Sequence, residues 1–216
     1  GQKQKALKDF NKARQLAPDD PTPHLNRGMV LRASGQEDKA IDAFNKALEL
    51  DEECAEAWQA KGFFELKNES YEEARRSFDK TIELRPYEAS NYYNRANTFA
   101  ARGEFEKAIE DYTEAIELDE EDTESLVNRG QAKLKMEDFQ GAINDWNQAI
   151  EIDPYYAMPY LKRAGVWQML DQPKEASEDA LKALEVAPND WDYRPYAKKL
   201  LRDIADELGY DPSQAD

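Results

Sequence analysis

The sequence predicts an all-α solenoid built from pairs of helices, because three kinds of residue recur with a single period of 34. The first is an alanine: Ala6, Ala40, Ala74, Ala108, Ala142 and Ala176. The second follows four residues later and is aromatic until the last copy: Phe10, Phe44, Phe78, Tyr112, Trp146 and then Ala180. The third lies twelve residues before an alanine and is again small: Gly28, Gly62, Ala96, Gly130 and Ala164. A fixed period of this length is typical of stacked helix-turn-helix units.

These columns are expected to form the buried seam of each helix pair. Residues three, four and seven positions apart lie on the same side of a helix. A small side chain lets two helices approach closely, and the aromatic ring fills the space beside it. Breaks within a pair are expected at Ser34-Gly35, Arg102-Gly103 and Asp171-Gln172-Pro173. Breaks between pairs are expected near proline: Pro18, Pro86, Pro154 and Pro188.

The pattern resembles the tetratricopeptide repeat (TPR) family over nearly the whole chain. Tyr93-Asn94-Arg95-Ala96 looks like the first helix of that repeat, and residues 106–112 (EKAIEDY) look like its second helix. The resemblance implies a right-handed α-solenoid of helix-turn-helix TPR repeats with a C-terminal capping helix. The expected divisions are a partial repeat at 1–20 with a second helix only, full repeats at 21–54, 55–88, 89–122, 123–156 and 157–190, a capping helix at 191–210 and a flexible tail at 211–216.

Both ends depart from the repeat pattern. Residues 2–17 have the pattern of a second helix without its first helix, which predicts an apolar edge at Phe10 and Leu16. This half-repeat suggests a piece of a longer array, and it allows weak self-association. Near the other end, one apolar stripe is expected to cover the last repeat: Tyr196, Leu200, Leu201, Ile204 and Leu208.

The composition argues against several classes of partner. A formal net charge of −17 repels phosphate, so nucleic acid is not an expected partner. No stretch approaches the roughly 18 apolar residues of a membrane span, and no signal peptide is visible, so no membrane contact is expected. The single cysteine, Cys54, fits a reducing compartment, and we expect a cytoplasmic, intracellular protein.

No catalytic, cofactor or metal site is expected, and we predict that the chain is not an enzyme. Cys54 falls in a loop between repeats and is expected to be an unreactive surface thiol. His24 is the only histidine, and its column otherwise holds Trp, Tyr and Leu, so packing is its expected role. The acidic runs at 51–53 and 119–122 lack the alternating ligands and central glycine of a calcium loop.

In the TPR family the first helices line a concave groove that holds an extended peptide. The helix period assigns the candidate peptide-binding residues of this chain: Leu25, Met29, Phe63, Tyr93, Asn94, Asn97, Asn128, Gln131 and Lys162. A side-chain amide both donates and accepts hydrogen bonds, so the asparagines suit a peptide backbone. The apolar members would take its side chains. The expected function is therefore a non-catalytic scaffold or adaptor that binds an extended segment of a protein partner.

Two alternatives stay open. One TPR subgroup binds the acidic C-terminal tails of Hsp70 or Hsp90, and such co-chaperones use a clamp of lysine, asparagine and arginine. Asn97 and Asn128 match the asparagine places and Lys162 the arginine, whereas the two lysine places hold Tyr93 and Met158. Losing two cations weakens an anion site, which counts against this reading. The second alternative is a regulatory or targeting domain of a larger enzyme.

A further column is cationic in every full repeat: Arg27, Lys61, Arg95, Arg129 and Arg163. It could form a basic ladder for an acidic partner, or it could pair with acidic residues of neighbouring helices. A ligand would rarely need five such residues. The repetition therefore favours the structural role.

Overall fold

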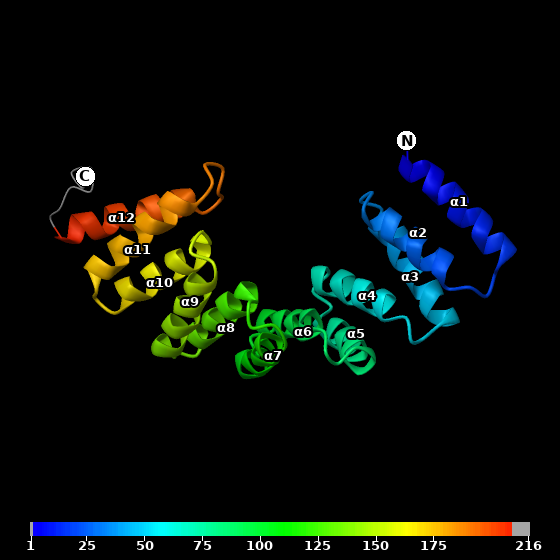
Figure 1. The fold of residues 1–216 in the computed structure, drawn as a ribbon, viewed down its shortest axis with the longest axis horizontal. Helices are drawn as coiled ribbons and strands as arrows, with labels where there is room; N and C mark the ends of the chain where they lie inside the picture. Colours follow the sequence, from blue (N-terminus) through cyan, green and yellow to red (C-terminus); the bar gives the residue numbers. More distant parts are fainter. Residues whose placement is uncertain (1, 209–216) are drawn as a thin grey trace. The chain divides into compact units, whose positions relative to one another are not determined.

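The computed structural model describes residues 2–208. All regular structure in that range is helical, in the order α1 Gln2–Leu16, α2 Thr22–Arg32, α3 Glu37–Leu50, α4 Ala55–Lys67, α5 Tyr71–Leu84, α6 Ala89–Ala101, α7 Phe105–Leu118, α8 Thr123–Lys135, α9 Phe139–Ile152, α10 Ala157–Met169, α11 Pro173–Val186 and α12 Arg194–Leu208. The prediction of an all-α repeat solenoid is confirmed (Figure 1). The tail expected at 211–216 lies outside the described residues.

The chain divides into two compact units, residues 1–107 and residues 108–216, with the division inside α7. In the first unit, α2 packs against α3 and α4 packs against α5. In the second unit, α8 packs against α9, α10 against α11, and α11 against α12. Below, α2, α4, α6, α8 and α10 are called first helices, and α1, α3, α5, α7, α9 and α11 are called second helices.

The close approach of first and second helices is set by the glycine column. A Cβ atom added to Gly28 would lie 2.5 Å from a ring carbon of Phe44. At Gly130 the same atom would lie 2.7 Å from Nε1 of Trp146, which donates a hydrogen bond to the carbonyl of Val127 at 3.2 Å. Phe44 and Trp146 are buried. The expected seam of small and aromatic residues is therefore confirmed at these pairs.

Gly130→Ala should lower the free energy of unfolding by about 1–3 kcal/mol, because the added methyl group would overlap the indole of Trp146. This cost should exceed the gain of about 1 kcal/mol that alanine brings to a helix interior. Gly165 in α10 is a matched control, since an added Cβ meets no atom within 4 Å there. Gly165→Ala should raise stability by up to about 1 kcal/mol. Urea unfolding of both variants tests this, and stabilisation at both positions would contradict it.

The turn inside each helix pair contains one residue with a positive φ angle. These residues also recur every 34 positions: Gly35 (71°), Glu69 (59°), Gly103 (77°), Glu137 (63°) and Asp171 (56°). The next residue closes the turn, as when the N–H of Asp138 donates to the carbonyl of Lys133 at 3.0 Å. Glycine accepts this left-handed conformation without strain, whereas a residue with a Cβ atom is strained by about 1 kcal/mol.

Glu137→Gly should raise the free energy of unfolding by about 0.5 kcal/mol, because relief of this strain exceeds the added flexibility of the unfolded chain. Glu137→Ala is the control, since it removes the same charge and keeps the Cβ atom. We expect no gain from it. Equal effects of the two substitutions in urea unfolding would assign the change to the charge and would refute the role of the φ angle.

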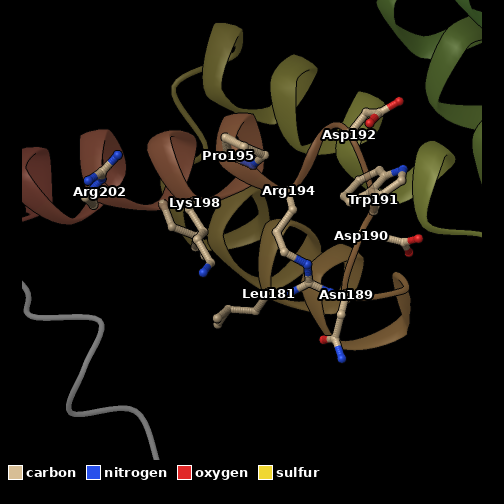
Figure 2. A pocket seen from close by; sticks show the side chains of 10 residues that line it. Leu181, Asn189, Asp190, Trp191, Asp192, Arg194, Pro195, Lys198 and Arg202 are labelled. Carbon is tan, nitrogen blue, oxygen red and sulfur yellow. The ribbon is translucent and has the colours of Figure 1, made fainter.

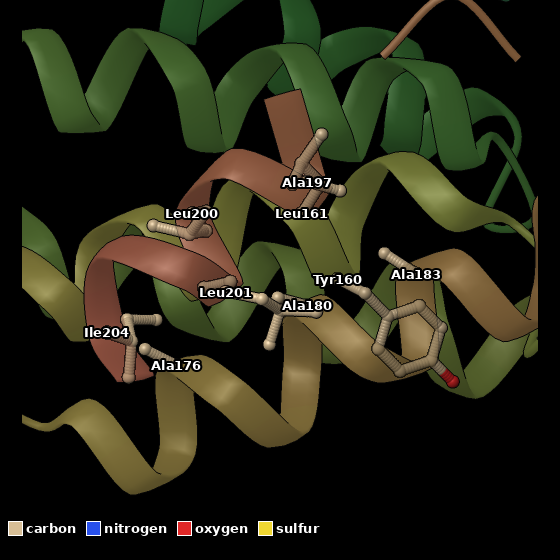
Figure 3. Close-up of a cluster of buried hydrophobic side chains, with 10 residues drawn as sticks. Tyr160, Leu161, Ala176, Ala180, Ala183, Ala197, Leu200, Leu201 and Ile204 are labelled. Atoms are coloured by element: carbon tan, nitrogen blue, oxygen red, sulfur yellow. The ribbon is translucent and has the colours of Figure 1, made fainter. Parts of the chain in front are cut away.

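The last helix pair lacks the aromatic ring of its column, and α12 fills the space. Leu200, Leu201 and Ile204 of α12 pack in one buried cluster with Ala176 and Ala180 of α11 (Figure 3). The expected apolar stripe is confirmed for these three residues. It was wrong for Tyr196, which is 55% exposed because Ala197 takes the buried place in that turn of α12. The side chain of Leu208 lies outside the described residues.

Candidate partner-binding surface

His24 and Cys54, the two side chains that were considered for catalysis in the sequence, are both buried. His24 is 8% exposed, so its expected packing role is confirmed. Cys54 is also buried, in the cluster of Phe44 and Ala57, and the expectation of a surface thiol was wrong. Cys54 directly precedes α4, and its side chain lies in the buried cluster beside the start of that helix. Burial raises the pKa of the Cys54 thiol, which reduces the reactive thiolate.

In the described part of the chain, no three His, Cys, Asp or Glu side chains gather as metal ligands. Across the same residues, no helix is both long and apolar enough to cross a bilayer.

The arginine column joins helices to one another. Arg129 of α8 donates from Nε and Nη2 to the carboxylate of Asp145 on α9, at 3.1 and 2.8 Å. Its third contact runs to the preceding second helix, from Nη1 to the hydroxyl of Thr113 at 3.0 Å. The arrangement recurs one repeat later, where Arg163 donates to Asp179 at 2.7 and 2.6 Å and also to Asn147.

The first unit shows the same kind of link. Arg95 of α6 donates to Asp79 of α5 at 2.8 Å, and Arg75 shares that carboxylate at 2.5 Å. Lys61 lies 3.8 Å from Glu65 on its own helix. The contacts of Arg95, Arg129 and Arg163 confirm the structural role expected for these three members of the cationic column, whereas Lys61 contacts a carboxylate of its own helix.

Arg129→Ala should lower the free energy of unfolding by about 2–4 kcal/mol, because it leaves the buried carboxylate of Asp145 with Lys133, at 2.9 Å, as its remaining ion-pair partner. The control is Lys80→Ala, which breaks an exposed pair with Glu83 and should cost less than about 0.5 kcal/mol. Guanidinium unfolding measures both. Binding of a partner should be unchanged where Arg129→Ala remains folded. Weaker binding at an unchanged melting temperature would reassign Arg129 to the ligand.

In the first unit, most of the predicted groove residues are accessible. Met29 is 40% and Phe63 is 39% exposed, and Phe63 stacks edge-on against the buried Phe78 with ring centres 5.6 Å apart. The partly exposed members are Leu25, Tyr93 and Asn97. Asn94 differs from the expectation, because its side chain is only 5% exposed. A ligand therefore has little access to that amide.

In the second unit, the predicted residues Asn128, Gln131 and Lys162 are all partly exposed. Lys162 of α10 donates to Oε1 of Gln131 on α8 at 2.7 Å. Both line a hollow of about 340 Å³ that also contains Tyr193 and Tyr196. Sequence reasoning missed this contribution of the α12 region. The signal available to it was a pair of tyrosines three positions apart, one just before α12 and one in its first turn.

A larger hollow of about 980 Å³ lies between the end of α11, the connection that follows it and α12 (Figure 2). Arg194 holds this connection, since its Nη2 donates to the carbonyls of Leu184, Ala187 and Pro188 at 2.7–3.2 Å. Cations at a helix C-terminus satisfy the last carbonyl groups. Lys198 and Arg202 of α12 also line this hollow and are exposed.

The helix pairs and the exposed faces of the first helices together define a helical-repeat protein of the protein-interaction class. The tetratricopeptide repeat matches four successive segments: residues 22–54, 55–88, 89–122 and 123–156. The chain therefore belongs to the tetratricopeptide repeat family. The pair α10–α11 lies beyond these segments. No curated protein sequence matches the chain.

Several solved structures share the fold. A TPR protein with an unusual peptide-binding site, YrrB, superposes with a TM-score of 0.71 at 24% identity, covering 88% of this chain and 97% of YrrB. MamA gives a TM-score of 0.69 at 24% identity, over 74% of this chain and 93% of MamA. Yeast Tom70 gives 0.73 at 19% identity, over 94% of this chain and 43% of Tom70. Identities this low indicate a shared fold only.

Proposed function

We propose that this chain is a non-catalytic, intracellular scaffold or adaptor that binds extended segments of partner proteins on its first helices. The observation that carries the proposal is the contrast between the two sides of these helices. The seam side is filled by buried rings and small residues, as at Gly130 and Trp146. The other side keeps accessible apolar and amide groups, such as Phe63, Met29 and Gln131.

Each unit contributes its own contacts to the proposed binding. In the first unit, Asn97 bonds to the peptide backbone, and apolar pockets are offered by Leu25, Met29, Phe63 and Tyr93. In the second unit, the polar contacts come from Asn128, Gln131 and Lys162. An amide suits this task because it donates to a carbonyl and accepts from an N–H group. Asn94 contributes least, since it is buried.

No observation favours the co-chaperone alternative, because the two lysine places of that clamp hold Tyr93 and Met158. The family of the chain consists of protein-interaction repeats, which supports the non-catalytic proposal over an enzyme. The description of YrrB as a peptide-binding TPR protein supports the choice of a peptide ligand. We do not propose nucleic acid or membrane as a partner, given the net charge of −17.

Asn97→Ala combined with Asn128→Ala should weaken partner binding about tenfold, since each substitution removes a hydrogen-bonding amide from the proposed surface. The matched control is Asn45→Ala with Asn144→Ala, which removes two exposed asparagines from the second helices α3 and α9. The partner is first captured from cell lysate by the wild-type chain and identified by mass spectrometry. Its bound segment is then labelled, and affinity is measured by fluorescence anisotropy.

The proposal would fail if both double variants bound the segment as tightly as the wild type. It would also fail if the control pair lost affinity and the first-helix pair did not, since that result places the partner on the second helices. Circular dichroism melting curves of all proteins exclude unfolding as the cause of any loss.

A further inference from the structure

A surface away from the predicted groove residues combines apolar and cationic side chains. It is the hollow of about 980 Å³ between α11, the connection that follows it and α12, and we call it the α11–α12 hollow (Figure 2). Leu181, Trp191, Pro195 and Leu201 supply its apolar lining. None of the residues that the sequence assigned to peptide binding lines it.

Leu181 departs from the repeat pattern. The five preceding residues of its column are polar: Asn11, Asn45, Asp79, Thr113 and Asn147. The last three accept a hydrogen bond from the arginine of the following first helix, as Thr113 does from Arg129 at 3.0 Å. In α12 that arginine is replaced by Ala197, so Leu181 has no such donor to meet. Leu181 is nevertheless 43% exposed, so packing against α12 does not account for an apolar residue here.

Cationic residues lie along one side of the α11–α12 hollow. Arg194, Lys198 and Arg202 follow one another at intervals of four on α12, and residues at this spacing lie on the same face of a helix. The two acidic residues of the lining, Asp190 and Asp192, lie on the connection, at the opposite end of the hollow from Arg202 (Figure 2). In a chain of net charge −17, this face of α12 is therefore suited to a negatively charged surface.

The stability of α12 does not account for its first cation. Anionic side chains stabilise the N-terminal turn of a helix, yet that turn of α12 contains Arg194 and no acidic residue. The Nη2 atom of Arg194 contacts three backbone carbonyls at the end of α11. Its Nε is the one buried side-chain nitrogen or oxygen in the described part of the chain without a hydrogen-bond partner. A carboxylate brought close to this guanidinium would interact favourably with it.

We propose that the α11–α12 hollow binds an acidic amphipathic helix of a partner protein. The apolar stripe of that helix packs on Leu181, Trp191 and Pro195, and the carboxylates beside the stripe lie next to Lys198 and Arg202. Carboxylates four residues apart on a helix are about 6 Å apart along its axis, which is also the spacing of these two cations on α12. The inference goes beyond the proposed function, because this surface is separate from the groove residues.

A helix suits this hollow better than an extended segment does. Within the described residues the lining contains no β-strand to which an extended segment could add. The backbone groups of α11 and α12 are used inside those helices, and Asn189 offers the one side-chain amide of the lining. An extended segment would bury peptide N–H and C=O groups with few partners, whereas a helix satisfies these groups internally.

The test selects peptides on the immobilised chain from two random libraries. One consists of helix-forming peptides of about 18 residues, or five turns. The other has the same length and a proline at every fourth position, which prevents a helix. We expect the wild type to enrich helical peptides that combine an apolar stripe with acidic residues four positions apart. A selected peptide is then labelled, and its affinity is measured by fluorescence anisotropy.

Lys198→Glu combined with Arg202→Glu should weaken binding of this peptide about tenfold, because two attractive contacts become repulsive. Each substitution is also made singly and compared with Lys199→Glu, since Lys199 is an exposed cation of the same helix that does not line the hollow. This control should leave the affinity nearly unchanged. Leu181→Asn, which introduces the residue type of Asn147, should also weaken binding, because it removes apolar contact area.

A second readout does not depend on the stability of the variant. The selected peptide with lysine in place of its acidic residues should bind the Lys198→Glu/Arg202→Glu variant more tightly than it binds the wild type. A partly unfolded variant could not produce this gain. Equal or weaker binding of the lysine peptide by the variant would overturn the inference.

Other outcomes also overturn the inference. Helical peptides without an acidic preference, or with equal affinity for the Lys198→Glu/Arg202→Glu variant, would place the binding elsewhere. An equal loss in Lys199→Glu would assign the effect to net charge. A dimer in sedimentation velocity that this double variant loses would assign the hollow to a second copy of the chain. Enrichment of the proline library alone would refute a helical partner and leave the proposed function intact, since that function requires extended segments.

Discussion

The contact between a small residue on a first helix and an aromatic ring on its second helix is the constraint on which the repeat depends. Where Gly28 faces Phe44, or Gly130 faces Trp146, the space left for a Cβ atom is smaller than any side chain tolerates. This contact fixes the distance and the rotation of both helices. The seam uses one side of each first helix, and the opposite side keeps side chains that are accessible in part, such as Met29 and Phe63.

Ion pairs between helices add directional contacts to the apolar packing. Each helix pair could pack against its neighbour through apolar contacts alone, but such contacts are not directional. Arg129 and Arg163 reach a carboxylate in their own pair and a polar group on the preceding second helix. A buried carboxylate without its cation is strongly unfavourable, so the ion pair favours one alignment of the two helices within a pair. The neutral contact to Thr113 or Asn147 links that pair to the preceding second helix. Part of the large acidic excess of the chain is thus structural.

Sequence periodicity predicts the contacts that recur in every repeat. It does not predict the contacts that a residue makes with neighbours outside its repeat. The 34-residue period was sufficient to predict the helix pairs, the Gly130–Trp146 type of contact and the structural role of Arg129. It could not show that Cys54 turns inward, since nothing in the loop composition reports the direction of the first side chain before a helix. The hollow beside Lys162 was missed for a similar reason. It needs Tyr196, which belongs to a helix with no counterpart in the repeat.

The alanine at position 180 has a consequence for how this array could grow. The pair α10–α11 has no ring at this position of α11, and Leu200, Leu201 and Ile204 of α12 pack there instead. A second copy of residues 157–190, inserted before α12, would place one such pair away from these three side chains. Ala180 and the leucines of α12 are therefore matched to one another, and a unit added between α11 and α12 would need a ring at that position.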